Sequence, residues 1–344
     1  MQNPHKNLKG TLTKNAPLGA QSWFRCGGNA DLLFQPADQA DLAAFLKTHP
    51  YGEPLTIIGG LANTIIRDGG IRGATIQLGK AFSDISLIPS SCGSRCPWAM
   101  TAGSHAEPQG DAVFVKAGAG ALNGSIAAFA VKNGIGGFEF LSGIPGTLGG
   151  ALRMNAGAYG ADIADILIEI HALDCAGNKF VLRPRPMDTA NIPSDAEALE
   201  INLSYRNNDA PHYLIFTGAI LRGKVEDYAT VKSRITDIKA KRNETQPIKE
   251  QTGGSTFANP NAAALRRVNL PQNTRAWQVV DMVGGRGLTI GGAKMSEKHC
   301  NFMINTGNAT ATDLEMLGDE LITRARHDLG LDLHWEIKRV GEKV

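Results

Sequence analysis

Alternating apolar and polar side chains predict that the first two thirds of the chain are mostly β-strand. In residues 198–206, Leu199 and Ile201 alternate with polar neighbours, which is the pattern of a strand with one buried face. Arg206 falls on the polar face of this predicted strand. Short apolar runs predict further strands at 54–60, 111–120 and 213–221, and a hairpin at 166–184 around an Asp-Cys-Ala-Gly-Asn turn.

After residue 222 the apolar spacing becomes that of helices. Val231, Ile235 and Ile238 lie three or four positions apart and mark one face of a helix. A second helix is predicted from a capping box, Thr312 to Glu315, up to Gly330. The stretch 331–339 alternates again and predicts a closing strand with Glu336 on its polar face. We therefore expect a boundary near residue 222, between a β-rich part and a smaller α+β part.

Composition narrows the class of protein. The 344 residues carry a formal net charge of +2, which argues against a nucleic-acid-binding protein because such proteins need a concentrated basic surface. The densest basic run, 239–244, is interpreted as the solvated end of a helix. No apolar stretch reaches the roughly 18 residues of a membrane helix, and the first residues lack the apolar centre of a signal peptide. These features predict a cytoplasmic protein without a membrane partner.

The five cysteines are scattered, which is typical of a reducing compartment. Cys92 and Cys96 lie in a Ser-, Gly- and Pro-rich stretch, 84–110, without a second cysteine pair at metal-ligand spacing. We interpret that stretch as a surface loop and predict no metal site.

Glycine is the most informative residue type in this chain. Forty glycines are present, and several are bunched, above all in GIPGTLGGALRMNAGAYG at 143–160. Bare backbone lets N–H groups approach an anion closely, so these bunches suggest a phosphorylated ligand that lies along several loops. The alternative is that they only form tight turns of a β-rich domain. The chain has neither a P-loop nor the G-x-G-x-x-G motif of dinucleotide-binding folds.

Several motifs, in order and spacing, resemble the UDP-N-acetylenolpyruvoylglucosamine reductase family. They are TIIGGLANTIIRDGGIRG at 56–73, the glycine segment at 143–160, LSYRNN at 203–208, GGSTFANP at 253–260, IGGAKMSEKHCNFMIN at 290–305 and HWEIKRVG at 334–341. The short segment after Arg206 resembles the subtype that lacks an extra tyrosine loop. Ala62 and Ala258 depart from the family pattern, which often has serine and lysine there.

The resemblance implies an α+β fold: a vanillyl-alcohol-oxidase (PCMH)-type FAD-binding domain in two subdomains, and a C-terminal α+β substrate domain. The implied division is an N-terminal extension at 1–20, the FAD-binding domain at 21–222 and the substrate domain at 223–344, whose final strand packs back toward the flavin. It also implies non-covalent FAD, with NADPH as the hydride donor. The cofactor-binding residues carried over by position are Gly59, Gly60, Asn63, Gly143, Ile144, Pro145, Gly146, Thr147, Gly149, Gly150, Asn155 and Gly157.

The same resemblance implies a reaction and three catalytic residues. The substrate would be UDP-N-acetylglucosamine enolpyruvate and the product UDP-N-acetylmuramate, a peptidoglycan precursor. Arg206 would neutralise the substrate carboxylate, Glu336 would polarise the developing enol, and Ser255 would protonate the α-carbon as the general acid. Asn259 would contact the uridine diphosphate.

Two other functions compete with this one. A flavin oxidase or dehydrogenase of the same fold, acting on a sugar, lactone or alcohol, would explain the glycines equally well. It would not explain why GGSTFANP and the terminal glutamate occur together. A flavin- or nucleotide-binding regulator without activity is disfavoured by the presence of Arg206, Ser255 and Glu336.

Overall fold

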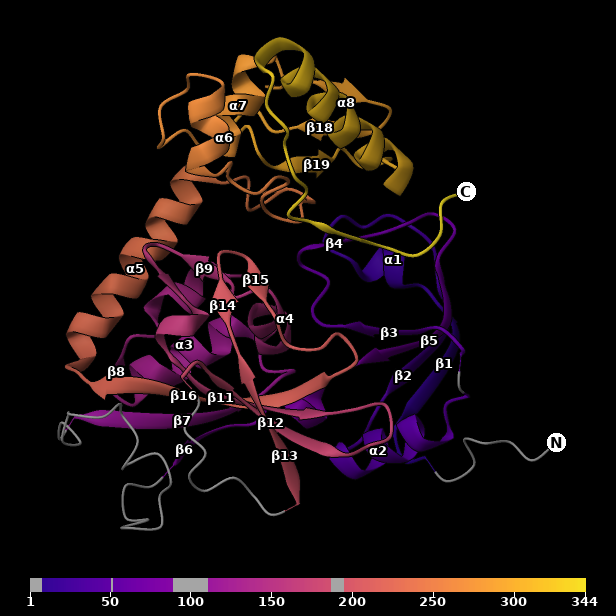
Figure 1. Cartoon of the computed structure of the whole chain (residues 1–344), viewed down its shortest axis with the longest axis vertical. Coiled ribbons are helices and arrows are strands. Elements are labelled where there is room, and N and C mark those ends of the chain that lie inside the picture. Colours follow the sequence, from indigo (N-terminus) through magenta and orange to yellow (C-terminus); the bar gives the residue numbers. More distant parts are fainter. Residues whose placement is uncertain (1–7, 51, 89–110, 187–194) are drawn as a thin grey trace.

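The computed structural model describes residues 8–50, 52–88, 111–186 and 195–344; the predictions for Cys92 and Cys96 lie outside these ranges. The predicted surface loop at 84–110 is wrong at its start, where Ile85–Ile88 forms a strand, β6. Two β-sheets and their helices make up the first two thirds of the chain, and a helix-rich unit of the last third stands above them (Figure 1). The helix α5 runs along one flank and leads from the sheets to that unit (Figure 1).

The smaller sheet has four strands in the order β1-β2-β5-β3. Strand β1 is antiparallel to β2, whereas β2, β5 and β3 run parallel. One apolar face packs on helix α2, with Phe34 stacked on Phe45 and both fully buried. The bounds are β1 Thr11–Ala16, β2 Ala30–Gln35, β3 Leu55–Ile58, β5 Ile71–Gln77 and α2 Gln39–Thr48. Part of the predicted N-terminal extension therefore forms an edge strand of this sheet.

The larger sheet has the order β13-β12-β11-β16-β7-β6, with the short strand β8 beside β16. The predicted hairpin is confirmed as β11 and β12, and the predicted strands at 54–60, 111–120 and 213–221 are confirmed as β3, β7 and β16. The bounds are β6 Ile85–Ile88, β7 Ala112–Gly118, β8 Ile135–Gly136, β11 Leu167–Leu173, β12 Lys179–Pro184, β13 Ala196–Ile201 and β16 Ile215–Val225.

Short helices and strands lie between the strands of the two sheets in the sequence. They are α1 Leu18–Gln21, β4 Thr64–Ile66, η1 Lys80–Phe82, α3 Asn123–Lys132, η4 Glu139–Gly143, α4 Leu148–Arg153, β9 Gly157–Ala158, β10 Ala161–Asp162, η5 Ile163–Asp165, β14 Leu203–Ser204 and β15 Asn207–Asn208. The expectation that Arg206 lies on the polar face of a strand is wrong. Strand β13 ends at Ile201, and Arg206 occupies the tight turn between β14 and β15 with a φ of 56°.

The C-terminal unit packs helices against a small antiparallel sheet, β17-β18-β19. The bounds are α5 Tyr228–Thr245, α6 Ala262–Arg267, α7 Ala276–Met282, β17 Thr289–Ile290, β18 Ala293–Met295, β19 Met303–Asn305, α8 Ala311–Leu329 and β20 Lys338–Val340. The predicted capping box of α8 is wrong by two residues. The N-cap is Thr310, paired with Asp313, while Gly330 ends the helix in the left-handed conformation as expected.

The expected closing strand is shorter than predicted. Residues 331–337 keep the alternating burial, with Leu331, Leu333 and Ile337 inside, but only Lys338–Val340 forms a ladder. That strand, β20, lies parallel to β4 in the part of the chain before α5, so the last strand returns to the first sheets (Figure 1). Helix α5 also packs on η4 of that part, and Ile235 joins its core. The division at residues 20 and 222 stays a prediction.

Candidate active site

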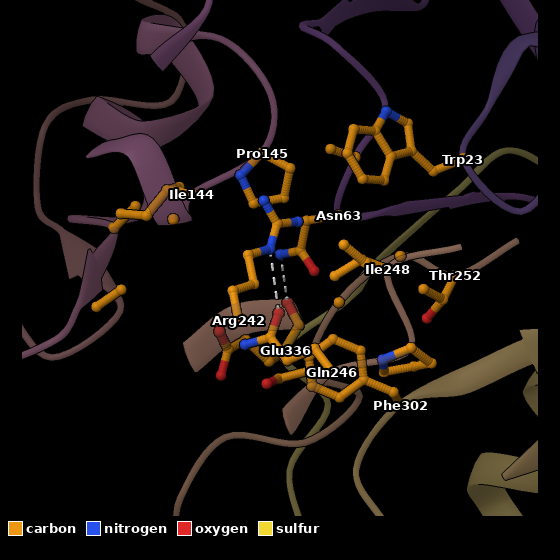
Figure 2. A pocket seen from close by; sticks show the side chains of 18 of the residues that line it. Trp23, Asn63, Ile144, Pro145, Arg242, Gln246, Ile248, Thr252, Phe302 and Glu336 are labelled. Atoms are coloured by element: carbon orange, nitrogen blue, oxygen red, sulfur yellow. Dashed lines mark hydrogen bonds between the residues drawn. The ribbon is translucent and has the colours of Figure 1, made fainter. Parts of the chain in front are cut away.

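Two adjoining cavities lie where the glycine loops, the end of α5 and the last residues of the chain meet. One is about 390 Å³ and the other about 150 Å³. They share six lining residues: Ala62, Asn63, Ile144, Pro145, Met154 and Ala156. Figure 2 shows side chains around the smaller cavity, among them Asn63, Pro145 and Glu336. The shared residues show that the two cavities adjoin.

The larger cavity is lined by the predicted cofactor loops. Its lining includes Gly59, Gly60, Asn63, Ile144, Pro145, Gly146, Thr147, Gly149 and Gly150. The two loops touch, because a Cβ at Gly59 would lie 2.5 Å from Thr147 Oγ1 and one at Gly60 would lie 3.1 Å from Gly146 Cα. Within the described ranges, the backbone N–H groups of Gly60, Ala62 and Gly146 donate no hydrogen bond to the protein. Free N–H groups on bare loops that border a cavity suit a pyrophosphate.

Arg153 and His212 line the same cavity from a different segment of its wall. The Arg153 guanidinium donates to the carbonyls of Ala210, Pro211 and Leu214 and lies 3.9 Å from the centre of the Phe216 ring. Burial lowers the pKa of Arg153 to about 10. Apolar side chains, among them Ile57, Leu78 and Ile215, line the rest of this cavity. Glycine loops beside an apolar wall suit an elongated dinucleotide such as FAD.

In the smaller cavity, Arg206 and Glu336 form an ion pair. Arg206 Nε donates to Glu336 Oε1 at 2.9 Å, and its Nη2 donates to the Gly157 carbonyl at 2.8 Å. Only 11% of the Glu336 side chain is exposed. Burial raises the pKa of the Glu336 carboxyl above its usual range, and the Arg206 guanidinium opposes that rise. The pair therefore provides a carboxyl whose ionisation is tuned by its surroundings.

Backbone contacts fix Glu336 between two loops. Its N–H donates to the Thr256 carbonyl at 2.8 Å, and its own carbonyl accepts from Asn63 Nδ2 at 3.2 Å. The Lys338 N–H then donates to the Asn63 carbonyl. The final segment is thereby held to the first glycine loop on one side and to the Ser255 loop on the other.

Ser255 lines the same cavity as Arg206 and Glu336. It follows Gly254, whose φ of 87° is the left-handed conformation that favours glycine. A Cβ at the preceding Gly253 would lie 2.3 Å from the buried Phe24 ring, so the loop can take this path only with glycine there. The Ser255 hydroxyl makes no hydrogen bond to any described residue, which leaves it available to a ligand.

The structure brings most of the predicted site residues to these cavities, but not all of them. Gly143 and Gly157 line the smaller cavity, whereas Asn155 and Asn259 line neither. Asn155 is buried and bonds Asp162 and the Ser204 carbonyl. Asn259 donates to the Tyr205 hydroxyl and accepts from the Ala276 N–H. Direct ligand contacts of these two asparagines stay predictions.

Trp23, Arg242 and Thr252 are among the lining residues of the smaller cavity that are absent from the predicted set. Arg242 belongs to the basic run that was interpreted as solvated, yet it lies in the last turn of α5 on the cavity wall. A signal for it exists, because Arg242 follows Ile238 at a spacing of four and so continues the apolar face of the helix. Nothing in the pattern around Trp23 or Thr252 marks either as a cavity residue.

The described residues show neither a metal-ion cluster nor a membrane-spanning helix. No group of three or more His, Cys, Asp or Glu side chains there is arranged to hold a metal ion. None of the helices described is long and apolar enough to cross a membrane.

Two protein-family models and several named relatives match this chain. An FAD-binding domain family matches residues 30–182, and the C-terminal domain family of UDP-N-acetylenolpyruvoylglucosamine reductase matches residues 246–340. The UDP-N-acetylenolpyruvoylglucosamine reductase of Gluconobacter oxydans is 42% identical over 99% of this chain and 95% of its own length. That of Maricaulis maris is 40% identical over 97% of this chain and 93% of its own length.

A crystal structure of UDP-N-acetylenolpyruvylglucosamine reductase from Thermus caldophilus has the same fold, with a TM-score of 0.70 and 23% identity. It covers 97% of this chain, and this chain covers all of it. The expected fold class, an α+β flavoprotein of the vanillyl-alcohol-oxidase type with a further α+β unit, is confirmed.

The fold, the glycine-lined cavity and the FAD-binding domain define an FAD-dependent oxidoreductase. Full-length similarity of 40–42% to named relatives narrows this class to one family. The chain belongs to the UDP-N-acetylenolpyruvoylglucosamine reductase family.

Proposed function

We propose that this protein reduces UDP-N-acetylglucosamine enolpyruvate to UDP-N-acetylmuramate, with NADPH as the hydride donor. The relatives that carry this reductase name support the reaction class. The observation that carries the proposal is that Arg206, Ser255 and Glu336, which lie far apart in the sequence, line one cavity beside the glycine loops. The product is a peptidoglycan precursor, and we place the reaction in the bacterial cytoplasm.

The glycine loops would hold the cofactor. Loop residues 59–63 and 143–150 would bind the FAD pyrophosphate through backbone N–H groups, and Gly157 would lie against the ring system, with Asn155 bracing its segment from behind. Bound FAD supplies the hydride-transfer chemistry. Amino-acid side chains do not transfer hydride, so the residues of the protein would bind, orient and protonate the substrate.

Arg206 and Glu336 would act as a pair on the substrate. Arg206 Nε donates to Glu336 and Nη2 donates to the Gly157 carbonyl. Nη1 therefore remains to donate to the substrate carboxylate. Negative charge grows on that carboxylate when hydride reaches the β-carbon, and a fixed guanidinium stabilises it. Glu336, nearly buried, would hold the enol oxygen or polarise it.

Ser255 would deliver the proton to the α-carbon. A hydroxyl is a weak acid in water, so the transfer depends on the carbanion being held close by and on local hydrogen bonds to the alkoxide that remains. The position of Ser255 on the cavity wall, next to Gly254 with its left-handed backbone, supports this assignment. Asn259 would act further along the nucleotide, on the uridine diphosphate side.

Anaerobic half-reactions test this function. The FAD-loaded protein is reduced with NADPH, UDP-N-acetylglucosamine enolpyruvate is added, and flavin absorbance near 450 nm is followed. We expect prompt bleaching by NADPH and prompt recovery with the enol ether, with NADH as the comparison donor. A flavin that stays reduced until air is admitted would instead indicate an oxidase of the same fold.

A further inference from the structure

The motif at 290–305 contributes no residue to the proposed reaction, yet it borders the candidate active site. Its residues 296–302 form the tight turn between β18 and β19, in which the Asn301 and Phe302 N–H groups both donate to the His299 carbonyl. Phe302 lines the smaller cavity (Figure 2), as Ser255 does. Asn301 is only 4% exposed and lines neither cavity. Its side chain therefore acts on the protein itself.

The Asn301 amide binds both backbone groups of one residue. Its Oδ1 accepts from the Phe257 N–H at 3.0 Å, and its Nδ2 donates to the Phe257 carbonyl at 2.8 Å. The amide thus pairs with Phe257 as a neighbouring strand would. The Asn301 main chain adds a third contact, because its carbonyl accepts from the Thr256 N–H at 2.7 Å. All three contacts hold the two residues that directly follow Ser255.

The residues on the other side of Ser255 cannot fix it in this way. They are Gly253 and Gly254, which have no side chains, and Gly254 has a left-handed φ of 87°. Phe257 is 1% exposed, so its N–H and carbonyl would be left unpaired away from water without the Asn301 amide. The direction of the Ser255 hydroxyl is therefore set from the side that Asn301 holds.

Glu336 depends less on this contact than Ser255 does. Its N–H donates to the Thr256 carbonyl, but Asn63 also binds its carbonyl at 3.2 Å. Arg206 binds its carboxylate at 2.9 Å. Loss of the Asn301 amide would therefore release the segment 255–257, while Glu336 keeps two of its own contacts.

We infer that Asn301 is a positioning residue that aims the Ser255 hydroxyl at the carbon that receives the proton. The inference rests on the proposed function for the role of Ser255. Proton transfer requires the donor within hydrogen-bonding reach of the reacting atom, and a displacement of about 1 Å can cost about 100-fold in rate. Flavin reduction by NADPH takes no proton from Ser255, so it should not depend on Asn301.

The test compares the FAD-loaded full-length protein with Asn301→Ala in anaerobic stopped flow. Asn301→Ala should slow reoxidation by the enolpyruvyl substrate by about 10- to 100-fold and leave NADPH-driven flavin reduction nearly unchanged. Asn301→Asp keeps the acceptor but loses the donor, so it should slow reoxidation as well, and it carries the same comparison if Asn301→Ala does not bind FAD.

Asn305→Ala is the matched control. Asn305 is 5% exposed, and its amide binds the Phe24 carbonyl and N–H groups of the turn before α8 instead of the segment 255–257. Its loss also leaves buried backbone groups unpaired, so it should cost stability in the same way. It should leave the ratio of the two half-reaction rates unchanged.

A double-variant cycle separates positioning from a general loss of structure. In Ser255→Ala the hydroxyl is absent, so adding Asn301→Ala should slow reoxidation further by less than about 3-fold. The full factor in that background, or equal losses in both half-reactions, would overturn the inference.

Hydrogen exchange gives a measurement that does not need the enol ether. Asn301→Ala should speed exchange at the Phe257 N–H and its neighbours, whereas Asn305→Ala should not. If this difference is found but the parent is not reoxidised by the enol ether, the proposed function fails and the hold of Asn301 on this segment stands. Unchanged exchange in Asn301→Ala would contradict the inference whatever the rates.

Discussion

The Arg206–Glu336 pair sets the electrostatics of the smaller cavity. Arg206 reaches it from a left-handed turn and Glu336 from an extended segment near the chain end, and each is held by a backbone contact as well as by the other. Charged partners this close restrict rotamers and keep the guanidinium where charge is proposed to grow. Ser255, with no partner of its own, is the group whose function depends on a ligand.

Replacing Ser255 with Ala should separate the two half-reactions. NADPH-driven flavin reduction should stay nearly intact, whereas reoxidation by the enolpyruvyl substrate should slow by about 10²- to 10⁴-fold, because only the second step needs a proton donor. Stopped-flow absorbance of each half-reaction measures this. Ser233→Ala, an exposed serine of α5, is the control. Equal losses in both half-reactions would refute the assigned role.

His299 should make stability depend on pH. It packs edge-on against Phe302, and its Nδ1 is buried without a partner among the described residues. Burial lowers its pKa in the folded state below the usual 6.5, so the unfolded chain binds the proton more readily. The neutral His299 ring therefore favours the folded state, and this contribution to stability is complete above about pH 6.5 and is lost as the pH falls below that value. Urea unfolding at pH 8 and pH 5.5 should show a smaller pH effect in His299→Gln; an unchanged pH effect would contradict this.

Single residues also show where sequence reasoning stops. Glycines at 59–60 and 146–150 could be placed at a cofactor site through the family resemblance, because bare backbone alone fits tight turns equally well. Arg242 and Trp23 could not, because a side chain becomes a cavity residue only through the packing of distant segments around it. Asn155 shows the converse: its motif predicts a ligand contact, while its described hydrogen bonds hold the protein's own loop together.

Helix α8 is capped by a residue from another part of the chain. Asp68, the second residue after β4, accepts hydrogen bonds from the Ala311 and Thr312 N–H groups and from the Thr312 hydroxyl. Beside it, Arg67 pairs with the nearly buried Glu315 at 2.7 Å. The N-terminus of α8 thus depends on the flavin-type part for its free N–H groups.

Asp68→Ala should lower the free energy of unfolding by about 1–2 kcal/mol, the usual cost of losing an N-cap. Asp68→Asn should lose less because it keeps an acceptor. Asp38→Ala serves as the comparison. It removes the N-cap of α2, a helix whose core contacts lie in the two sheets and not in the C-terminal unit. Urea denaturation measures all three, and we expect only the Asp68 variants to loosen α8 in hydrogen exchange. Equal exchange in α8 of the parent and Asp68→Ala would contradict the proposed dependence.

The strands themselves can be predicted from the sequence more easily than the pairs they form. Strands β3, β7, β11 and β12 follow from short apolar runs and turn residues, because those signals are local. The pairing of β4 with β20 joins residues about 270 positions apart, and a strand's pattern shows its buried face, not its neighbour. The capping box of α8 was misplaced because Thr310 and Thr312 both precede an acidic residue by three positions.

At the scale of the whole molecule, the first and last parts of the chain are joined at one seam. Lys338–Val340 pairs with Thr64–Ile66, Gly69 N–H donates to the Glu342 carbonyl, and Arg67 reaches the Gly341 carbonyl. Thr64, Lys338 and Val340 of this seam line the larger cavity. The arrangement couples the stability of the C-terminal unit to that of the sheets.

Removing residues 335–344 should abolish turnover and lower stability. The deletion takes away Glu336 and the β20 ladder, and it exposes the core around Ile337. A chain that lacks only Lys343 and Val344 should behave like the parent, because both are exposed at the end of the seam. Steady-state turnover and urea unfolding distinguish them, and an active 334-residue chain would refute the role of Glu336.

The seam has a consequence for how the protein is made. A ribosome releases the two sheets and the glycine loops long before it finishes the chain, so the walls of the larger cavity can form during synthesis. Glu336 is made later, because it lies 111 positions after Val225, the last residue of β16 (336 − 225). The Arg206–Glu336 pair can therefore form only after α8 has been synthesised, so most of the larger cavity takes shape before the smaller one is complete.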